Sequence, residues 1–335
     1  MKVVDLFCGC GGLSMGFDKA GFDIVASFDN WDDALAVYRA NFAHPVFKQD
    51  LMNVEDSINR VRPYRPDIII GGPPCQDFSS AGKRDEDGGR GDLTVAYANI
   101  IAAVRPEWFV MENVERIQKT QKLVDAKRIY KQAGYGLTYT VLDASLCGVP
   151  QKRKRFVMVG KLDEPDDFIL PELIENLSKK PLSVAEYFGE SLGINYYYRH
   201  PRSYARRGIF STDEPSPTIR GVNRPMPEGY ELHANDPVSS KEGIRPLTTK
   251  ERSMIQTFPE DFVFLGSKTN QEQMIGNAVP VNLGFYVAEA IKRFMERHDI
   301  PFERVEPKPR PCCYRQMEMM LTANESVAKY EKRKR

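Results

Sequence analysis

Residues 2–30 read KVVDLFCGCGGLSMGFDKAGFDIVASFDN, in which two apolar runs flank a glycine turn and an amphipathic stretch. The runs VVDLF and FDIVASF have the composition of buried strands, and helical periodicity begins at Leu13. A glycine turn between strand and helix lets a ligand approach the backbone and the helix N-terminus, although a tight turn without a ligand uses the same residues. The segment therefore predicts a β-α-β unit with a candidate ligand site.

The same alternation continues along the first 160 residues. A helix is expected over residues 31–41, and further buried strands over 67–71, 108–111, 137–142 and 156–160. Strands that alternate with helices in this way are typical of an α/β fold with a doubly wound sheet.

The alternation of strand and helix patterns stops between residues 163 and 243, where Pro, Gly, Arg and Tyr are frequent. Helical periodicity returns at 248–257 and 281–297. We therefore expect one large domain in two parts, 1–162 and 244–298, interrupted by a smaller irregular domain over 163–243. Residues 299–335 are predicted to form a C-terminal extension that packs peripherally or frays.

Charge is nearly balanced over the 335 residues, with 47 basic and 46 acidic side chains and a net charge of +1. The net charge alone does not indicate a nucleic-acid-binding protein, but two segments are locally basic. Residues 196–227 contain six arginines against two acids, and residues 152–155 read KRKR.

Cysteine usage indicates a reducing compartment, because six cysteines in a chain of this length form no disulfide framework. Neither Cys8-x-Cys10 nor Cys312-Cys313 has the paired spacing of a zinc site, so no metal is expected. No apolar run reaches the length of a membrane span, and no signal peptide precedes the first strand. These features predict a cytoplasmic protein without a membrane segment.

Two acidic residues follow the second and third predicted strands, Asp29 after VASF and Asp50 after VFKQ. In doubly wound folds, a carboxylate at the second strand end binds ribose hydroxyls, and a side chain at the third can address an adenine edge. Surface acids are common, so the order of the two favours a nucleoside-type cofactor more than either residue alone.

The sharpest feature is Gly71-Gly72-Pro73-Pro74-Cys75, directly after the apolar run of a buried strand. Prolines stiffen the loop that presents the thiol, which suits a nucleophile better than an inert packing residue, the commonest fate of a free cysteine. Glu112 ends another strand, where desolvation favours a protonated carboxyl that can donate a proton. In QKRKR, strand alternation points Gln151, Arg153 and Arg155 to one side, although a solvated basic edge has the same pattern.

Six motifs in order resemble the DNA cytosine-5 methyltransferase family, between Val3 and Phe285. They are FCGCGG (7–12), GGPPCQDFS (71–79), ENV (112–114), QKRKR (151–155), RPLTTKERSMIQTFP (245–259) and GNAVPVNL (276–283). The resemblance implies a Rossmann-like fold that uses S-adenosyl-L-methionine, with a target recognition domain in the variable middle. Asp29 stands where the family often has Glu, and Cys10 occupies a variable place.

The resemblance also assigns roles. It implies Cys75 as the nucleophile at cytosine C6, Glu112 at the N3 and N4 edge, and Arg155, supported by Arg153, at O2. The S-adenosylmethionine pocket is expected to comprise Phe7, Gly9, Gly11, Gly12, Asp29, Asn30, Asp50, Leu51, Pro73, Leu93, Asn277 and Val279.

The expected substrate is double-stranded DNA whose target cytosine is flipped out of the stack, because its ring atoms are inaccessible within a duplex. The glycine-rich loop 78–92 is expected to close over that base, unless it is an ordinary surface loop. Thr218-Ile219 resembles a short signature of the family's recognition domains. The predicted DNA contacts are Ser79, Arg90, Arg206, Arg207, Thr218, Arg220 and Arg224.

Two alternatives stay open at this point. One is a tRNA methyltransferase of the same fold, but the Cys-Phe-Thr tripeptide of that branch is absent. The other is an inactive DNA-binding homologue, against which the intact Cys75, Glu112 and Arg155 argue. We expect a monomer that acts alone or beside a cognate restriction endonuclease.

Overall fold

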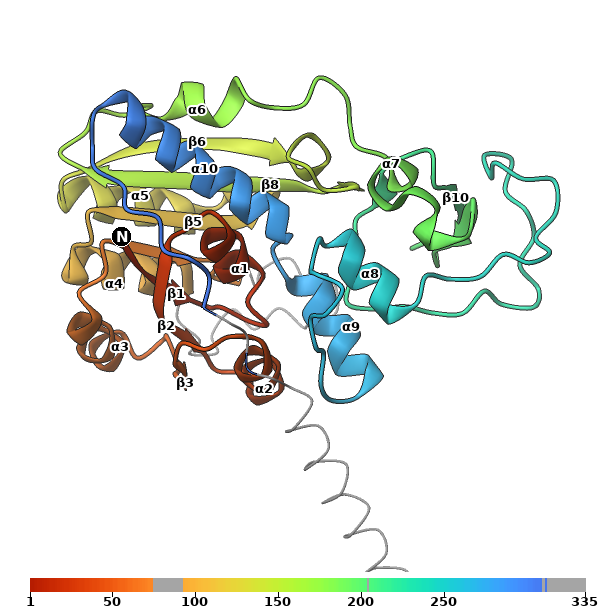
Figure 1. The fold of residues 1–335 in the computed structure, drawn as a ribbon, viewed down its shortest axis with the longest axis horizontal. Helices are drawn as coiled ribbons and strands as arrows, with labels where there is room; N and C mark the ends of the chain where they lie inside the picture. The colour runs from red at the N-terminus through yellow and green to blue at the C-terminus, as the bar shows by residue number, and fades with distance from the viewer. Residues whose placement is uncertain (75–92, 204, 309–310, 312–335) are drawn as a thin grey trace, which may run out of the picture.

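The computed structural model describes residues 1–74, 93–203, 205–308 and 311. Within these residues a seven-stranded sheet has the order β3-β2-β1-β4-β5-β8-β6 (Figure 1). Its strands are β1 (Lys2–Leu6), β2 (Asp23–Asp29), β3 (Val46–Lys48), β4 (Ile68–Gly71), β5 (Trp108–Val114), β6 (Tyr135–Asp143) and β8 (Lys154–Leu162).

Strands β1 to β5 pair in parallel, whereas β8 runs antiparallel to both β5 and β6. Parallel neighbours require crossover connections, and the helices of these connections cover both faces. They are α1 (Gly12–Lys19), α2 (Asp32–Asn41), α3 (Val54–Val61), α4 (Leu93–Val104) and α5 (Gln121–Gln132). The predicted α/β fold with a doubly wound sheet is confirmed.

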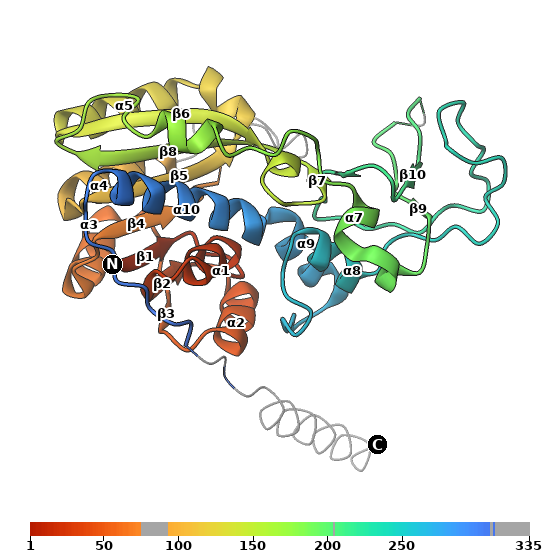
Figure 2. The ribbon, with the colours of Figure 1, turned by 45° about the horizontal axis from the view of Figure 1, so that its top comes forward.

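Alternating side chains of the strands build two separate cores. Val3 and Trp108 face the helix α10 (Val281–Arg297) and α1, whereas Val4 and Phe109 face α4 and α5. Figure 2 shows α10 lying across the sheet beside α1. The two helices approach closely because Gly16 has no side chain: a Cβ there would lie 2.5 Å from Phe285 N.

A smaller, irregular region lies to one side of the sheet (Figure 1). Its elements are α7 (Val184–Phe188), the antiparallel pair β9 (Tyr196–Tyr198) and β10 (Ile209–Ser211), and the short strand β11 (Ser216–Pro217). Its apolar core also takes Ile255 from α8 (Thr249–Ile255) and Ile275 from α9 (Lys268–Asn277). Helices α8 and α9 therefore join this region to the sheet.

The link between the regions is a backbone pairing, since β11 runs parallel to β7 (Gln151–Lys152). Between them in sequence lies α6 (Leu170–Ile174); its Leu173 and the preceding Ile169 are buried in the same core as the apolar residues of α10. The first residues after 162 thus pack on the sheet, and the irregular region begins later along the chain.

After α10 the chain returns along the sheet. Phe302 packs on Phe22 with ring centroids 4.9 Å apart, Val305 N donates to Gly21 O, and Lys308 Nζ lies 2.9 Å from an Asp23 carboxylate oxygen. Cys312 and Cys313 lie outside the described residues. In the part of the chain that the structure describes, no helix has the length and apolar character needed to cross a membrane.

Candidate functional site

A cavity of about 440 Å³ opens at the carboxyl ends of β1, β2, β4 and β5, and we call it the sheet-edge cavity. Parallel strands bring their carboxyl ends to one edge, so residues distant in sequence meet there. The end of α9 (Lys268–Asn277) and the two residues after it complete the wall. Predicted site residues that line it are Phe7, Gly9, Gly12, Asp29, Asn30, Pro73, Glu112, Arg153, Arg155, Asn277 and Val279.

The glycine turn between β1 and α1 shapes one wall. Gly9 has φ +53°, and a Cβ there would meet no atom within 4 Å, so the turn leaves room for a ligand. Gly12 is enclosed, because a Cβ added at this position would lie 2.1 Å from Val279 O. Gly11 does not line the cavity: it takes φ +96° at the start of α1, against the Phe42 ring.

Asp29 holds the turn in place from the end of β2. Its two carboxylate oxygens accept hydrogen bonds from Gly9 N at 2.8 Å and Trp31 N at 2.9 Å. Burial raises the pKa of Asp29, and these backbone donors oppose that rise. The carboxylate is thus oriented by backbone donors at the position where a ribose is expected.

Asp5 also lines the cavity and was not predicted. Its Oδ2 accepts a 2.5 Å hydrogen bond from Ser14, whereas its buried Oδ1 has no hydrogen-bond partner among the described residues. Burial raises the pKa of Asp5 to about 8. The charged residue inside the apolar run VVDLF was the signal that could have identified it.

Besides Gly11, three predicted cofactor residues do not line the sheet-edge cavity: Asp50, Leu51 and Leu93. The exposed Asp50 accepts a hydrogen bond from Met52 N at 3.0 Å, and Leu51 is buried in the core on the α4 face. Leu93 begins α4 directly after residues 75–92, which lie outside the described part. Their roles toward a cofactor stay predictions.

Glu112 and Arg155 form a nearly buried ion pair in the cavity wall, with Arg155 Nε 2.9 Å from Glu112 Oε1. The antiparallel pairing of β5 with β8 brings them together. Burial raises the pKa of Glu112, and the charges of Arg155 and Arg153 only partly oppose that rise. A carboxyl group that gains a proton readily is suited to donate a hydrogen bond to a ring nitrogen.

The predicted nucleophile Cys75 lies outside the described residues, but the residues that lead to it are described. Pro73 and Pro74 line the sheet-edge cavity, and Asn113 Nδ2 donates to Pro73 O at 2.8 Å. The strand end before Cys75 is therefore fixed next to Glu112.

Alternation along QKRKR is as predicted, since Gln151 and Arg153 are buried while Lys152 and Lys154 are exposed. Arg153 donates to the backbone oxygens of Ile219, Gly276 and Ala278. Gln151 completes the junction through the side chain of Gln256 and the backbone N of Ile219. These side chains join the sheet, α9 and the irregular region.

Cys8 and Cys10 line the sheet-edge cavity as buried thiols, and burial raises the pKa of both. Such thiols are poor nucleophiles because the thiolate is disfavoured. Among the residues that the structure describes, no three His, Cys, Asp or Glu side chains cluster as metal ligands would.

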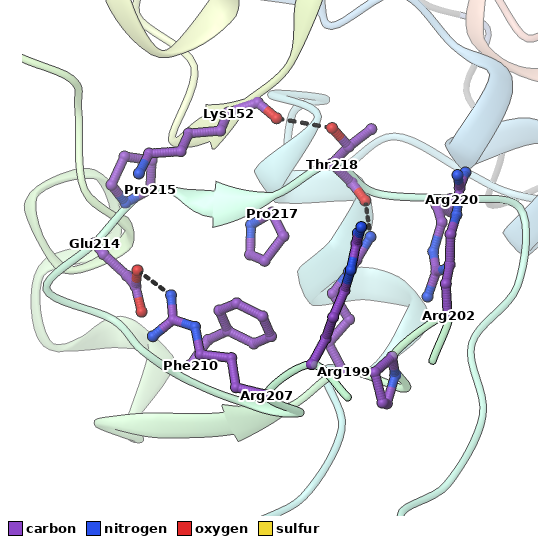
Figure 3. Close-up of a pocket in the computed structure, with 12 residues that line it drawn as sticks. Lys152, Arg199, Arg202, Arg207, Phe210, Glu214, Pro215, Pro217, Thr218 and Arg220 are labelled. Carbon is purple, nitrogen blue, oxygen red and sulfur yellow. Dashed lines mark hydrogen bonds and ion pairs between the residues drawn. The ribbon is translucent and has the colours of Figure 1, made fainter. Parts of the chain in front are cut away.

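A second cavity, of about 510 Å³, lies in the irregular region, and we call it the arginine-lined cavity (Figure 3). Predicted DNA contacts that line it are Arg206, Arg207, Thr218 and Arg220, and Lys152, Arg199 and Arg202 line it without having been predicted. Arg224 lines a neighbouring recess, and Ser79 and Arg90 lie outside the described residues. Thr218 faces the protein: its hydroxyl donates to Lys152 O and its carbonyl accepts from Arg199.

Comparison with known proteins gives a consistent picture. Residues 1–293 match the family described as C-5 cytosine-specific DNA methylase. The type II methyltransferase M.HindV of Haemophilus influenzae is 58% identical over 295 residues, which cover 88% of this chain and 97% of that relative. M.HgiDI of Herpetosiphon aurantiacus, also a type II methyltransferase, is 52% identical over 89% of this chain and 96% of its own.

Among solved structures, the S. pombe Dnmt2 methyltransferase superposes with a TM-score of 0.64 at 15% identity, covering 89% of this chain and 99% of that one. At this identity the likeness establishes the fold alone.

Proposed function

The chain belongs to the C-5 cytosine-specific DNA methylase family, and from that premise we propose how its own residues carry out the reaction. It is a DNA (cytosine-5)-methyltransferase that uses S-adenosyl-L-methionine. DNA, rather than tRNA, is therefore its substrate.

The sheet-edge cavity is the proposed cofactor pocket. The open space above Gly9, the oriented Asp29 carboxylate and the unpartnered oxygen of Asp5 suit a ligand with ribose hydroxyls and an amino group. Phe7, Asn30, Pro73, Asn277 and Val279 would enclose it. When bound, S-adenosylmethionine supplies an electrophilic methyl group.

The remaining chemistry is assigned to protein groups. Cytosine C5 is a weak nucleophile, and attack of the Cys75 thiolate on C6 would convert the ring to an enamine that accepts the methyl group at C5. The protonated Glu112 would donate to N3, and Arg155 would stabilise charge at O2. Removal of the C5 proton and departure of Cys75 would then restore the aromatic ring.

The observation that carries this assignment is the Glu112–Arg155 pair, 2.9 Å apart in the wall that Pro73 and Pro74 share. It puts a proton donor and a cation beside the end of the strand that leads to Cys75. The same cavity contains the proposed cofactor residues, so the methyl donor and the target cytosine would meet there.

Domain roles follow from the packing. We propose that the sheet with α10 is the catalytic domain and that the irregular region, flanked by α8 and α9, recognises the target sequence. Arg153 would fix the position of the irregular region relative to the sheet through its hydrogen bond to Ile219 O. We further propose that the enzyme acts as a monomer in the cytoplasm, within a restriction-modification system whose endonuclease cuts the same site.

The test is covalent trapping on DNA that carries 5-fluorocytosine, which blocks removal of the group at C5. The wild type should form a complex that survives denaturing electrophoresis, and Cys75→Ser should form none. Cys147→Ser, which changes a buried thiol that does not line the sheet-edge cavity, is the matched control and should trap like the wild type. Trapping by Cys75→Ser would refute the assigned nucleophile.

A further inference from the structure

The arginines of the arginine-lined cavity differ in whether their charge is balanced. Arg207 is balanced, since its guanidinium lies 2.5 Å from a Glu214 carboxylate oxygen and 4.3 Å from the centre of the Phe210 ring. Arg199, Arg202 and Arg220 have no such partner: none of the three forms an ion pair within the described residues. We call these three residues the arginine cluster.

Members of the arginine cluster repel one another. Burial lowers the pKa of Arg199 to about 10, and the charges of Arg220 and Arg202 contribute to this shift. Burial likewise lowers the pKa of Arg220, with Arg202 and Arg224 adding to it. Like charges held together without an acid favour the binding of an anion or an acceptor-rich group.

Two members of the cluster are held in fixed directions by the backbone. Arg199 donates to Thr218 O at 2.8 Å, and Arg220 donates to His200 O. Each contact uses part of a guanidinium that has five donors, so several N–H groups remain for a ligand. Arg202 is exposed, and no hydrogen bond or ion pair engages its side chain in the described residues.

Figure 3 shows the cluster on one side of the cavity and the Arg207–Glu214 pair on the other, with Pro217 between them. A concave space with apolar walls accepts the flat edge of a base, whereas a phosphate needs no apolar wall. Of the base edges in the major groove, guanine presents two acceptors side by side, O6 and N7, which match a guanidinium.

We propose that the arginine cluster reads the O6 and N7 edge of one guanine in the recognition sequence, with Arg202 and Arg220 as donors. Arg207 makes no base contact and instead keeps β10 against Glu214. This inference rests on the proposed function, because it assigns specificity to the recognition region of a DNA methyltransferase.

The experiment measures tritiated methyl transfer to oligonucleotides that carry the recognition site, once that site has been identified. Each guanine of the site is replaced in turn by 7-deazaguanine, which lacks the N7 acceptor. The wild type should lose roughly 10-fold in kcat/KM at one guanine. Arg202→Ala should have a lower kcat/KM than the wild type on the normal site. Replacing the same guanine by 7-deazaguanine should lower its kcat/KM by less than 2-fold further, because the variant already lacks the contact between Arg202 and that guanine.

Arg202→Ala is decisive because no hydrogen bond or ion pair engages that side chain within the part of the chain that the structure describes. Arg220→Ala should show the same loss of sensitivity to 7-deazaguanine. Arg207→Ala is the matched control and should keep the sensitivity of the wild type to 7-deazaguanine. If Arg202→Ala keeps that sensitivity, or weakens all sequences alike as a phosphate contact would, the inference is wrong. If the wild type transfers no methyl group to any DNA, the proposed function fails, and the inference fails with it.

Discussion

The sheet-edge cavity and the arginine-lined cavity differ in how the charges of their arginines are balanced. In the first, Arg155 is paired with Glu112, and Arg153 donates to three backbone carbonyls, although its buried Nε has no hydrogen-bond partner among the described residues. In the second, the arginine cluster has no ion-pair partner among the described residues. The difference agrees with the roles proposed for them, which are chemistry in the first cavity and binding of an acceptor-rich group in the second.

The comparison also separates what each cavity should contribute. Changes in the sheet-edge cavity are expected to alter the rate of methyl transfer without altering which sequence is chosen. Changes in the arginine cluster are expected to alter the choice of sequence.

The largest effect is expected from Glu112→Gln, which removes the proposed proton donor to the cytosine ring. We expect kcat to fall by about 10²- to 10³-fold, the usual cost of losing one such donor. Single-turnover methylation at saturating DNA measures it. Glu115→Gln, at an exposed acid three residues along the chain, should leave kcat unchanged.

Arg153→Met tests the junction between the two regions. It leaves three backbone oxygens without their donor, and each buried unsatisfied group costs about 1 to 3 kcal/mol. The free energy of unfolding, measured in urea, should fall by about 3 kcal/mol. Lys154→Met, at an exposed neighbour, should change it by less than about 0.5 kcal/mol, and equal losses in both variants would count against the junction.

Asp5→Asn tests the buried acid of the sheet-edge cavity through pH. The pKa of Asp5 is raised from 3.8 to about 8, so the folded protein retains a proton that the unfolded chain releases. Its contribution to stability is therefore fully present below about pH 4 and is lost as pH rises toward 8, by up to about 1.4 kcal/mol per pH unit.

In thermal unfolding of the apoprotein, Tm of the wild type should accordingly fall more between pH 6 and 8 than Tm of Asp5→Asn. Parallel pH profiles for the two proteins would show that Asp5 is already ionised in the folded state.

The smallest effect is expected from Lys152→Ala, at the rim of the arginine-lined cavity. An exposed lysine suits a phosphate contact, so all sequences should bind more weakly by a similar factor. The slope of log K against log salt should become less steep by about 1. A sequence-dependent loss would instead place Lys152 with the base-reading residues.

Much of the sheet-edge cavity was predictable, because its residues follow strands of strong apolar pattern. Asp29 and Glu112 stand at such strand ends, and the parallel sheet gathers them by geometry. Asp5 interrupts the apolar run VVDLF, which is a visible signal, but the run alone does not show that its side chain points into a cavity. Gly11 was assigned to the pocket from its motif; it does not line the sheet-edge cavity and takes the left-handed conformation at the start of α1.

The irregular region was far less predictable, since its arginines follow no period. Sequence placed Arg207 and Thr218 among the DNA contacts, but the structure shows them engaged with Glu214 and Lys152 O. Arg199 and Arg202 were passed over because only the folded chain shows which guanidinium groups lack an acid.

The division of labour is tested most directly by bisulfite sequencing of plasmid DNA methylated by the wild type, Glu112→Gln and Arg202→Ala. The wild type should protect cytosines in one short sequence, and Glu112→Gln should protect the same sequence far more slowly. Arg202→Ala should protect a set that has lost discrimination at one guanine. A changed sequence with Glu112→Gln, or an unchanged one with a slower rate for Arg202→Ala, would contradict the account.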